Sequence, residues 1–223
     1  MRRVLAAAAA AAIATMSTVA IAQDAVKVDP THYKVVLENA AVRVLRISYA
    51  PNEKSVMHAH PDAIAVFLAA SKARMTLPDG KAEDVSFANE TAQYTPAGTH
   101  QPMNIGTSRV EVVLVEFKTA APGKATLPAS RPGLTLNVLA EGPRAMAYRT
   151  TATATFAEPA GTTHEFDQVV IALGSVQMAL SIDGKPTKTT WARGEAVFIP
   201  RGTPHESKNT GGKPVDFVIV AVK

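Results

Sequence analysis

Two histidines separated by a single residue, His58 and His60, are the first side chains in the sequence that could do chemistry. In a β-strand, residues i and i+2 project to the same face, so both imidazoles point the same way. Two neutral imidazoles on one face form half of a site for a divalent metal. A third histidine, His100, follows a Pro-x-Gly turn at 96–98, which can present it at the start of a strand. His58 and His60 therefore predict half of a metal site, and His100 is the candidate for its third ligand.

A weaker set of the same kind lies further along the chain, at His164, Gln168 and His205. Two imidazoles and one amide oxygen would hold a borderline metal loosely, so the simpler interpretation is that this second set binds no metal. The opposite assignment stays open, because Gln168 as a ligand would make this second set the active one. Ordinary polar lining, or histidines near surface loops, is the alternative for both sets, but of the six histidines only His32 lies outside them.

The segments around the two sets resemble each other, which indicates an internal duplication. HPDAIAVFLAAS, starting at His60, matches HEFDQVVIALGS, starting at His164, at a separation of 104 positions. Asp-Gly-Lys and Pro-x-Gly recur at the same separation, and from His100 to His205 onward the separation is 105. Several landmarks in the same order favour a tandem repeat. The segment 119–133 between the copies is interrupted by prolines and glycines, and it predicts a linker.

Short apolar and β-branched runs cut by turns fill both copies. The runs at 42–49 and 215–222 are typical of strands, and Asp-Gly pairs at 79–80 and 183–184 predict hairpins. No long segment between these runs has a helical period. Many short strands at regular spacing predict an all-β sandwich or barrel in each copy.

The second copy reads GEAVFIPRGTPHESKN from Gly194 to Asn209, which resembles the second cupin motif, G-x5-P-x-G-x2-H-x3-N, at every specified position. The first copy keeps the proline, the second glycine, the histidine and the asparagine of this motif, but it has Glu90 in place of the first glycine. The first cupin motif is eroded. Ile64 stands where its glutamate is expected in the first copy, and Gln168 stands there in the second.

This resemblance implies two tandem antiparallel jelly-roll barrels, at 23–118 and 134–223. It also implies a divalent metal, such as Fe, Mn or Zn, on the three histidines of the first barrel. Because Ile64 cannot bind a metal, the usual set of three histidines and one glutamate is broken, and Asp62 and Glu90 are the nearby carboxylates. Three histidines without a carboxylate still make a viable site with an open position.

The expected function is that of a metalloprotein acting on a small molecule, with an oxygenase-like or isomerase-like reaction. The alternative is a non-catalytic barrel protein that binds a small molecule or a metal, which the lost glutamate and the ligand-poor second copy favour. Cupin-like barrels often pair, so a homo-oligomer is among the assemblies that the resemblance implies.

The first 22 residues predict a signal peptide. Arg2 and Arg3 precede an alanine-rich apolar run, and Ala20-Ile21-Ala22 ends the segment with small residues at the cleavage positions. The arginine pair lacks the flanking residues of a twin-arginine signal, so both export routes stay open. A periplasmic or secreted protein is expected, without a membrane anchor after cleavage. The remaining positive charges are scattered, which excludes a nucleic-acid-binding surface, and without cysteine there is neither disulfide nor thiolate metal site.

Overall fold

The computed structural model describes residues 23–119 and 123–223, and in these ranges it is almost entirely β-structure. The predicted signal peptide at 1–22 lies outside the described residues and remains a prediction from the sequence. Within the described ranges, no helix has the length and apolar character needed to cross a membrane.

The strands fall into two groups along the chain. The N-terminal group follows the one-turn helix α1 (Ala25–Val28) and comprises β1 (Tyr33–Glu38), β2 (Val42–Tyr49), β3 (His58–His60), β4 (Ala63–Phe67), β5 (Ser71–Thr76), β6 (Ala82–Phe87), β7 (Thr91–Thr95), β8 (Gly98–Asn104) and β9 (Val110–Phe117). The C-terminal group comprises β10 (Leu134–Glu141), β11 (Ala145–Ala152), β12 (Asp167–Ala172), β13 (Val176–Ile182), β14 (Lys185–Trp191), β15 (Ala196–Ile199), β16 (His205–Asn209) and β17 (Val215–Val222).

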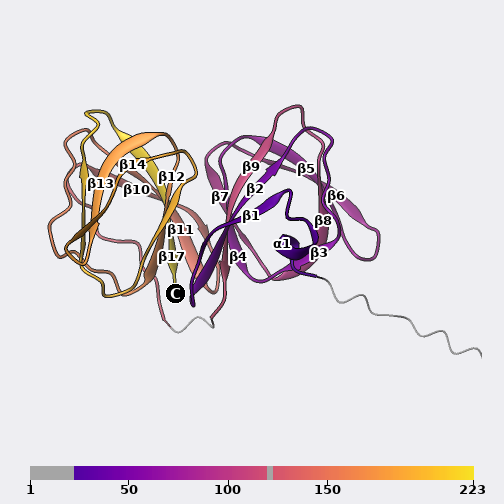
Figure 1. Ribbon diagram of the computed structural model, residues 1–223, viewed down its shortest axis with the longest axis horizontal. Helices are drawn as coiled ribbons and strands as arrows, with labels where there is room; N and C mark the ends of the chain where they lie inside the picture. The colour runs from indigo at the N-terminus through magenta and orange to yellow at the C-terminus, as the bar shows by residue number, and fades with distance from the viewer. Residues whose placement is uncertain (1–22, 120–122) are drawn as a thin grey trace, which may run out of the picture.

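Each group forms an antiparallel barrel of two sheets (Figure 1). The N-terminal barrel combines a five-stranded sheet, in the order β1-β2-β9-β4-β7, with a four-stranded sheet, β3-β8-β5-β6. The C-terminal barrel combines the order β10-β11-β17-β12-β15 with the three-stranded sheet β14-β13-β16. Neighbouring strands come from distant parts of the chain, as in a jelly roll. The predicted all-β fold of two tandem antiparallel jelly-roll barrels is confirmed.

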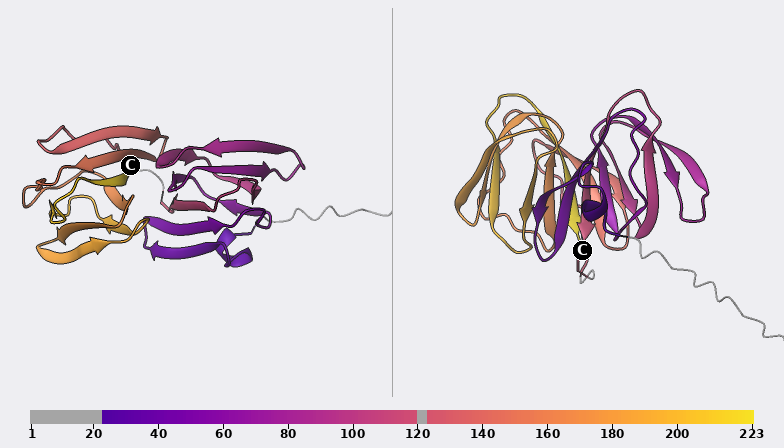
Figure 2. Two further views of the ribbon diagram at one scale, coloured as in Figure 1. Left: turned by 90° about the horizontal axis from the view of Figure 1, so that it is seen from above. Right: turned by 45° about the vertical axis from the view of Figure 1, so that its right-hand side comes forward.

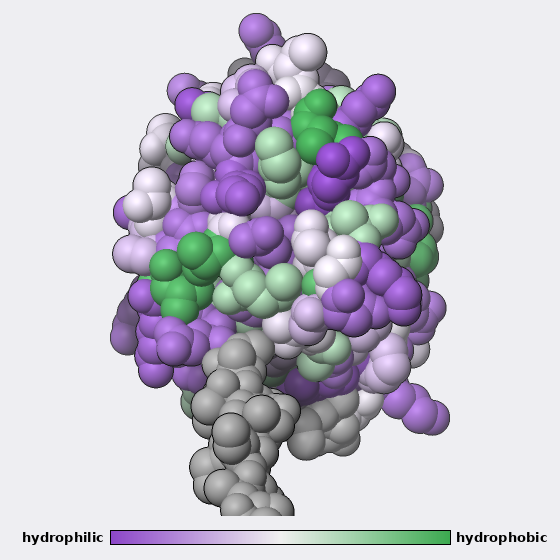
Figure 3. Space-filling model, turned by 90° about the vertical axis from the view of Figure 1, so that its right-hand side faces the viewer, coloured by the Kyte–Doolittle hydropathy of each residue, from purple (hydrophilic) through white to green (hydrophobic). Residues whose placement is uncertain are grey.

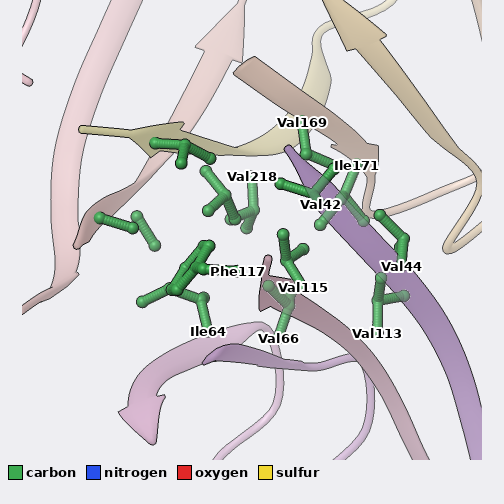
Figure 4. Packing of buried hydrophobic residues seen from close by; sticks show 14 of the residues in the cluster. Val42, Val44, Ile64, Val66, Val113, Val115, Phe117, Val169, Ile171 and Val218 are labelled. Carbon is green, nitrogen blue, oxygen red and sulfur yellow. The ribbon is translucent and has the colours of Figure 1, made fainter. Parts of the chain in front are cut away.

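The barrels lie side by side (Figure 2) and share one hydrophobic core where their five-stranded sheets meet (Figure 4). Residues of β2 and β9 such as Val44 and Val115 point out of the N-terminal barrel into this core. Their neighbours Leu45 and Leu114 point into the barrel interior. Because both of its faces are buried, β9 is largely apolar, whereas β2 also carries Arg43 and Arg46. The inter-barrel core consists of Val42, Val44, Ile64, Val66, Leu68, Val113, Val115, Phe117, Ala145, Ala147, Val169, Ile171, Leu173, Val218, Val220 and Val222.

Ile64 belongs to this inter-barrel core, which corrects the alignment of the two copies. It is fully buried there, on the face of β4 that points away from the barrel interior. In the C-terminal barrel, Gln168 on β12 pairs with Ala221 on β17. The residue that corresponds to Ala221 in the N-terminal barrel is Glu116 on β9, and it pairs with Ala63 on β4. The counterpart of Gln168 is therefore Ala63, at a separation of 105 positions, whereas their partners Thr95 and Ile199 keep the separation of 104.

Glu90, which replaces the motif glycine, adopts the same unusual backbone conformation as that glycine. Its φ is 56°, and the φ of Gly194 in the second copy is 77°. The turn at this place requires the left-handed region, which glycine enters without a steric cost. Glu90 also forms an ion pair with Arg149 of the other barrel at 3.0 Å. The substitution thus joins the two barrels at the edge of their shared core.

Asn104 and Asn209, the asparagines of the two motif copies, make the same hydrogen bonds in both barrels. Asn104 Nδ2 donates to the carbonyls of Tyr49 and Ser108 at 3.1 and 2.9 Å, and Oδ1 accepts a backbone N–H at 2.9 Å. Asn209 makes the equivalent three bonds at 2.9, 2.7 and 3.0 Å. Both side chains are buried, so this asparagine closes the loop after its strand and serves the fold rather than the chemistry.

Candidate metal centre and ligand pocket

The three histidines predicted for the first site lie together inside the N-terminal barrel. In the antiparallel register of β3 and β8, His58 lies opposite His100 and His60 lies opposite Gly98. The ring centroids of His58 and His60 are 5.1 and 4.8 Å from that of His100. His58 and His60 are only 1% and 8% exposed. The i and i+2 spacing therefore directs both rings to the same side, as expected from the sequence.

Hydrogen bonds fix the tautomers of two of these rings. His58 Nδ1 lies 2.8 Å from the carbonyl of Val56, and His60 Nδ1 lies 2.8 Å from the carbonyl of Pro61. A carbonyl only accepts, so each Nδ1 carries a proton. Burial lowers the pKa of His58, and burial together with the other two rings lowers the pKa of His100 to about 3. Imidazoles oriented by a bond at Nδ1 are a donor type that suits a divalent ion. The ligand atoms of His58, His60 and His100 do not all lie within 4.8 Å of one another, however, so the three rings would have to move closer together around an ion.

Tyr33 occupies the lone pair of one of these rings. Its Oη lies 2.9 Å from His58 Nε2, and Tyr49 Oη donates to Tyr33 Oη at 2.6 Å. Because His58 Nδ1 carries the proton, Nε2 accepts the hydrogen bond of Tyr33. A metal ion bound by His58 would have to replace this bond. The sequence analysis missed Tyr33, because its distance of 25 positions from His58 gives no local signal.

A second cluster lies in the C-terminal barrel and includes a carboxylate that the sequence analysis missed. Among the described residues, one group of His, Asp and Glu side chains has ligand atoms that all lie within 4.8 Å of one another. It consists of Glu158, His164 and His205. His205 Nε2 is 3.8 Å from Glu158 Oε2, and burial lowers the pKa of His164 to about 4. Two histidines and one carboxylate are a recognised ligand set for Fe(II). Gln168 is buried and lines the same pocket.

Glu158 is already held by other groups of the C-terminal barrel. Arg131 Nη1 donates to Glu158 Oε1 at 2.6 Å, and Ser207 Oγ donates to Oε2 at 3.0 Å. The guanidinium balances the carboxylate charge and also contributes to the lowered pKa of His164. A cation here would be repelled by Arg131. The cluster is therefore compact but balanced in charge without a metal.

Glu116 on β9 is the carboxylate that lines the N-terminal pocket. Asp62 and Glu90, the carboxylates that lie near the motif in sequence, do not line it. Asp62 accepts a hydrogen bond from the backbone N–H of Ala97 at 2.7 Å, and Glu90 pairs with the other barrel. Glu116 is 1% exposed and lines the cavity beside the histidines. Burial raises the pKa of its carboxyl, while Arg43 acts in the opposite direction.

The two barrels enclose cavities of different size. The cavity of the N-terminal barrel measures about 230 Å³, and that of the C-terminal barrel about 80 Å³. The face of the molecule in Figure 3 is mostly hydrophilic with separate small apolar patches. The apolar side chains of the N-terminal barrel gather inside it instead. Those lining its cavity include Ile47, Phe67, Met75, Val85, Phe87, Met103, Val110, Val112 and Leu114.

Comparison with known proteins supports the fold and leaves the activity open. No protein-family model matches the chain, and no curated protein matches it. A salicylate 1,2-dioxygenase from Pseudaminobacter salicylatoxidans matches with a TM-score of 0.60 and 12% identity, over 82% of this chain and 71% of that one. A variant of oxalate decarboxylase (B. subtilis) matches with a TM-score of 0.62 and 11% identity, over 85% and 71%. A cupin 2 conserved barrel domain protein from Leptotrichia buccalis matches with 0.56 and 13%, over 86% and 88%. At these identities the likeness shows the cupin fold alone.

Proposed function

We propose that this chain, which has the cupin fold, is a metalloprotein whose N-terminal barrel holds a divalent ion and binds a small molecule beside it. His58, His60 and His100 would hold the ion. The observation that carries the proposal is that three imidazoles, two of them bonded through Nδ1 to backbone carbonyls, line a largely apolar cavity of about 230 Å³. Fe, Mn or Zn bound there would polarise an oxygen of the substrate as a Lewis acid.

The balance of charge favours the N-terminal barrel over the C-terminal one. Arg43 contacts two carboxylates, Glu116 through Nε at 2.5 Å and Asp24 through Nη2 at 2.6 Å. One guanidinium and two carboxylates leave an excess of negative charge at this barrel, and Asp24 also acts on His58. In the C-terminal barrel, Arg131 compensates Glu158. A divalent cation would therefore be favoured more in the first barrel than in the second, where Arg131 and Glu158 balance each other.

The protein's own groups would orient the site and exclude water from it. The carbonyls of Val56 and Pro61 hold the rings of His58 and His60, and Tyr33 supports the first ring. The apolar wall of the cavity would exclude water from a bound molecule and strengthen its polar contacts. An oxygenase-like or isomerase-like reaction is proposed from the fold of the neighbours, which include a dioxygenase and a decarboxylase.

A non-catalytic barrel that binds a small molecule without a metal is the second candidate. The bond from Tyr33 Oη to His58 Nε2 favours it, because it satisfies the ring without an ion. For either candidate we propose a periplasmic or secreted location, which rests on the predicted signal peptide at 1–22.

The metal content of the protein decides between these candidates. The protein is purified without chelators or a histidine tag, and metals are measured by plasma mass spectrometry. A His60→Ala/His100→Ala variant is compared with a matched His164→Ala/His205→Ala variant, and thermal melting checks that both fold. Near-stoichiometric metal that is lost only in the first variant supports the proposal. Loss only in the second variant would move the site to the cluster around Glu158. No metal in the wild type, with none bound on reconstitution, would leave the non-catalytic candidate.

A further inference from the structure

One carboxylate oxygen in the N-terminal pocket is buried and has no hydrogen-bond partner. Glu116 is 1% exposed, and its Oε2 accepts a hydrogen bond from Arg43 Nε at 2.5 Å. Its other oxygen, Oε1, has no partner among the described residues. Proteins rarely leave a buried acceptor unpaired, so an atom of this kind calls for an explanation.

The direction of Glu116 follows from the alternation of β9. Val112, Leu114 and Glu116 line the cavity, whereas Val115 and Phe117 belong to the inter-barrel core. The carboxylate therefore points into the barrel together with the histidines of the candidate metal site.

The neighbouring groups of the protein do not supply the missing partner. Arg43 uses Nη2 for Asp24 at 2.6 Å, and His60 uses its Nδ1 proton for the carbonyl of Pro61. Glu116 lines the cavity, and its Oε1 lies buried at this wall without a partner among the described residues. A donor group of a molecule packed against this wall would satisfy it.

The fold itself does not require a carboxylate at this position. Ala221 stands at the corresponding place in the C-terminal barrel, and its partner across the strands is Gln168. In the N-terminal barrel the polar residue of the pair lies on the other strand, because Glu116 on β9 lies opposite Ala63 on β4. Each barrel therefore keeps one polar side chain at this level, on different strands. A purely structural need of β9 would have kept the same residue in both copies.

The rest of the cavity wall suits an apolar molecule. Phe67 and Phe87 stack with their ring centroids 3.8 Å apart, and Met75 and Val112 line the same wall. Flat aromatic faces of this kind pack well against a ring or a short hydrocarbon body.

We propose that Glu116 Oε1 accepts a hydrogen bond from a hydroxyl or amino group of a small, otherwise apolar molecule bound in the N-terminal pocket. The inference deepens the proposed function, since it rests on ligand binding in this barrel, but it does not depend on the metal. It names the ligand class: one hydrogen-bond donor at the end of the pocket near Glu116, and an apolar body against the phenylalanines.

Two probes that differ only in the donor test this inference. Phenol carries a hydroxyl, and anisole has the same ring with a methyl ether in its place. Their dissociation constants are measured by ligand-observed NMR on the full protein after chelation, so that phenol cannot bind through a metal. We expect phenol to bind more tightly than anisole by about tenfold, as for one hydrogen bond to a charged acceptor.

Two variants locate the effect. Glu116→Gln keeps a carbonyl for Arg43 and turns an amide N–H₂ to the pocket, so the preference for phenol should disappear. Ser71→Ala is the matched control, because Ser71 Oγ is another buried polar atom of this cavity wall without a partner among the described residues, and the preference should persist there within about twofold.

Equal affinity of the wild type for both probes would overturn the inference, and so would binding of neither. A preference that is lost in Ser71→Ala but kept in Glu116→Gln would also overturn it. The wild-type ratio alone decides the matter if Glu116→Gln does not fold. Metal content is measured separately, so a protein without metal that still prefers phenol would contradict the metal proposal and support this inference.

Discussion

Replacing Ile64 by glutamate tests whether the strand register assigns this side chain correctly. The resemblance to the first cupin motif suggests that Ile64→Glu completes a set of three histidines and one glutamate. The structure instead places the side chain, which is fully buried, in the core between the two barrels. We therefore expect the substitution to destabilise the protein and to leave its metal content unchanged.

The expected loss of stability has two parts. Ile64→Ala removes a fully buried side chain, which costs about 2–5 kcal/mol. The new carboxyl adds the cost of a charge in an apolar core. A pKa raised by about three units corresponds to about 4 kcal/mol at pH 8. Together these approach the total stability of a typical domain, so Ile64→Glu should be largely unfolded at pH 8.

The pH dependence separates the charge from the lost volume. A carboxyl whose pKa is raised in the folded state is not penalised for ionisation below its unfolded value of about 4.3, and the penalty grows as the pH rises toward the folded value. At pH 4.5 Ile64→Glu should therefore come within about 1–3 kcal/mol of Ile64→Ala, which shows no such trend.

Urea denaturation followed by the fluorescence of the buried Trp191 measures both variants at each pH. Metal content is determined in parallel. A folded Ile64→Glu protein at pH 8 with more metal than the wild type would refute the register argument, because the carboxyl would then lie in the pocket. Equal stability of the two variants at both pH values would refute the placement in the apolar core.

Three further predictions follow from the same contacts. Tyr33→Phe frees His58 Nε2 and should tighten metal binding several-fold, by about the value of one hydrogen bond, in competition with a chelating dye; weaker binding would mean that Tyr33 orients the ring. The folded pKa of His100 is lowered to about 3, so the chelated protein should lose stability as the pH falls below 6.5. His100→Gln should remove about 2–3 kcal/mol of that loss at pH 4.5. Identical acid profiles of the two proteins would contradict this. Asn209→Ala removes three buried hydrogen bonds and should lower the free energy of unfolding by about 2–3 kcal/mol without changing the metal content, as measured by urea denaturation and mass spectrometry.

Local patterns were enough to predict strands, hairpins and the shared face of His58 and His60, whereas the jelly-roll barrels and the place of His100 beside them followed from the resemblance to the cupin motifs. Alternating apolar runs and Asp-Gly turns predict strands and hairpins from neighbouring residues alone. His58 and His60 share a face because a strand repeats every two residues, and the turn before His100 places it at the start of β8. Each of these inferences spans only a few positions of the chain.

Such local patterns could not predict the carboxylates and the tyrosine of the two sites. Glu116 reaches the first pocket from β9, Tyr33 reaches it from β1, and Glu158 reaches the second cluster from the loop before β12. Their neighbours in space are far away in sequence or depend on which strands pair. Ile64 shows the same limit, because a shift of one residue moves a side chain from the pocket to the opposite face. The chain's local chemistry specifies that histidines line a barrel, and only the long-range register decides which acidic and phenolic groups meet them.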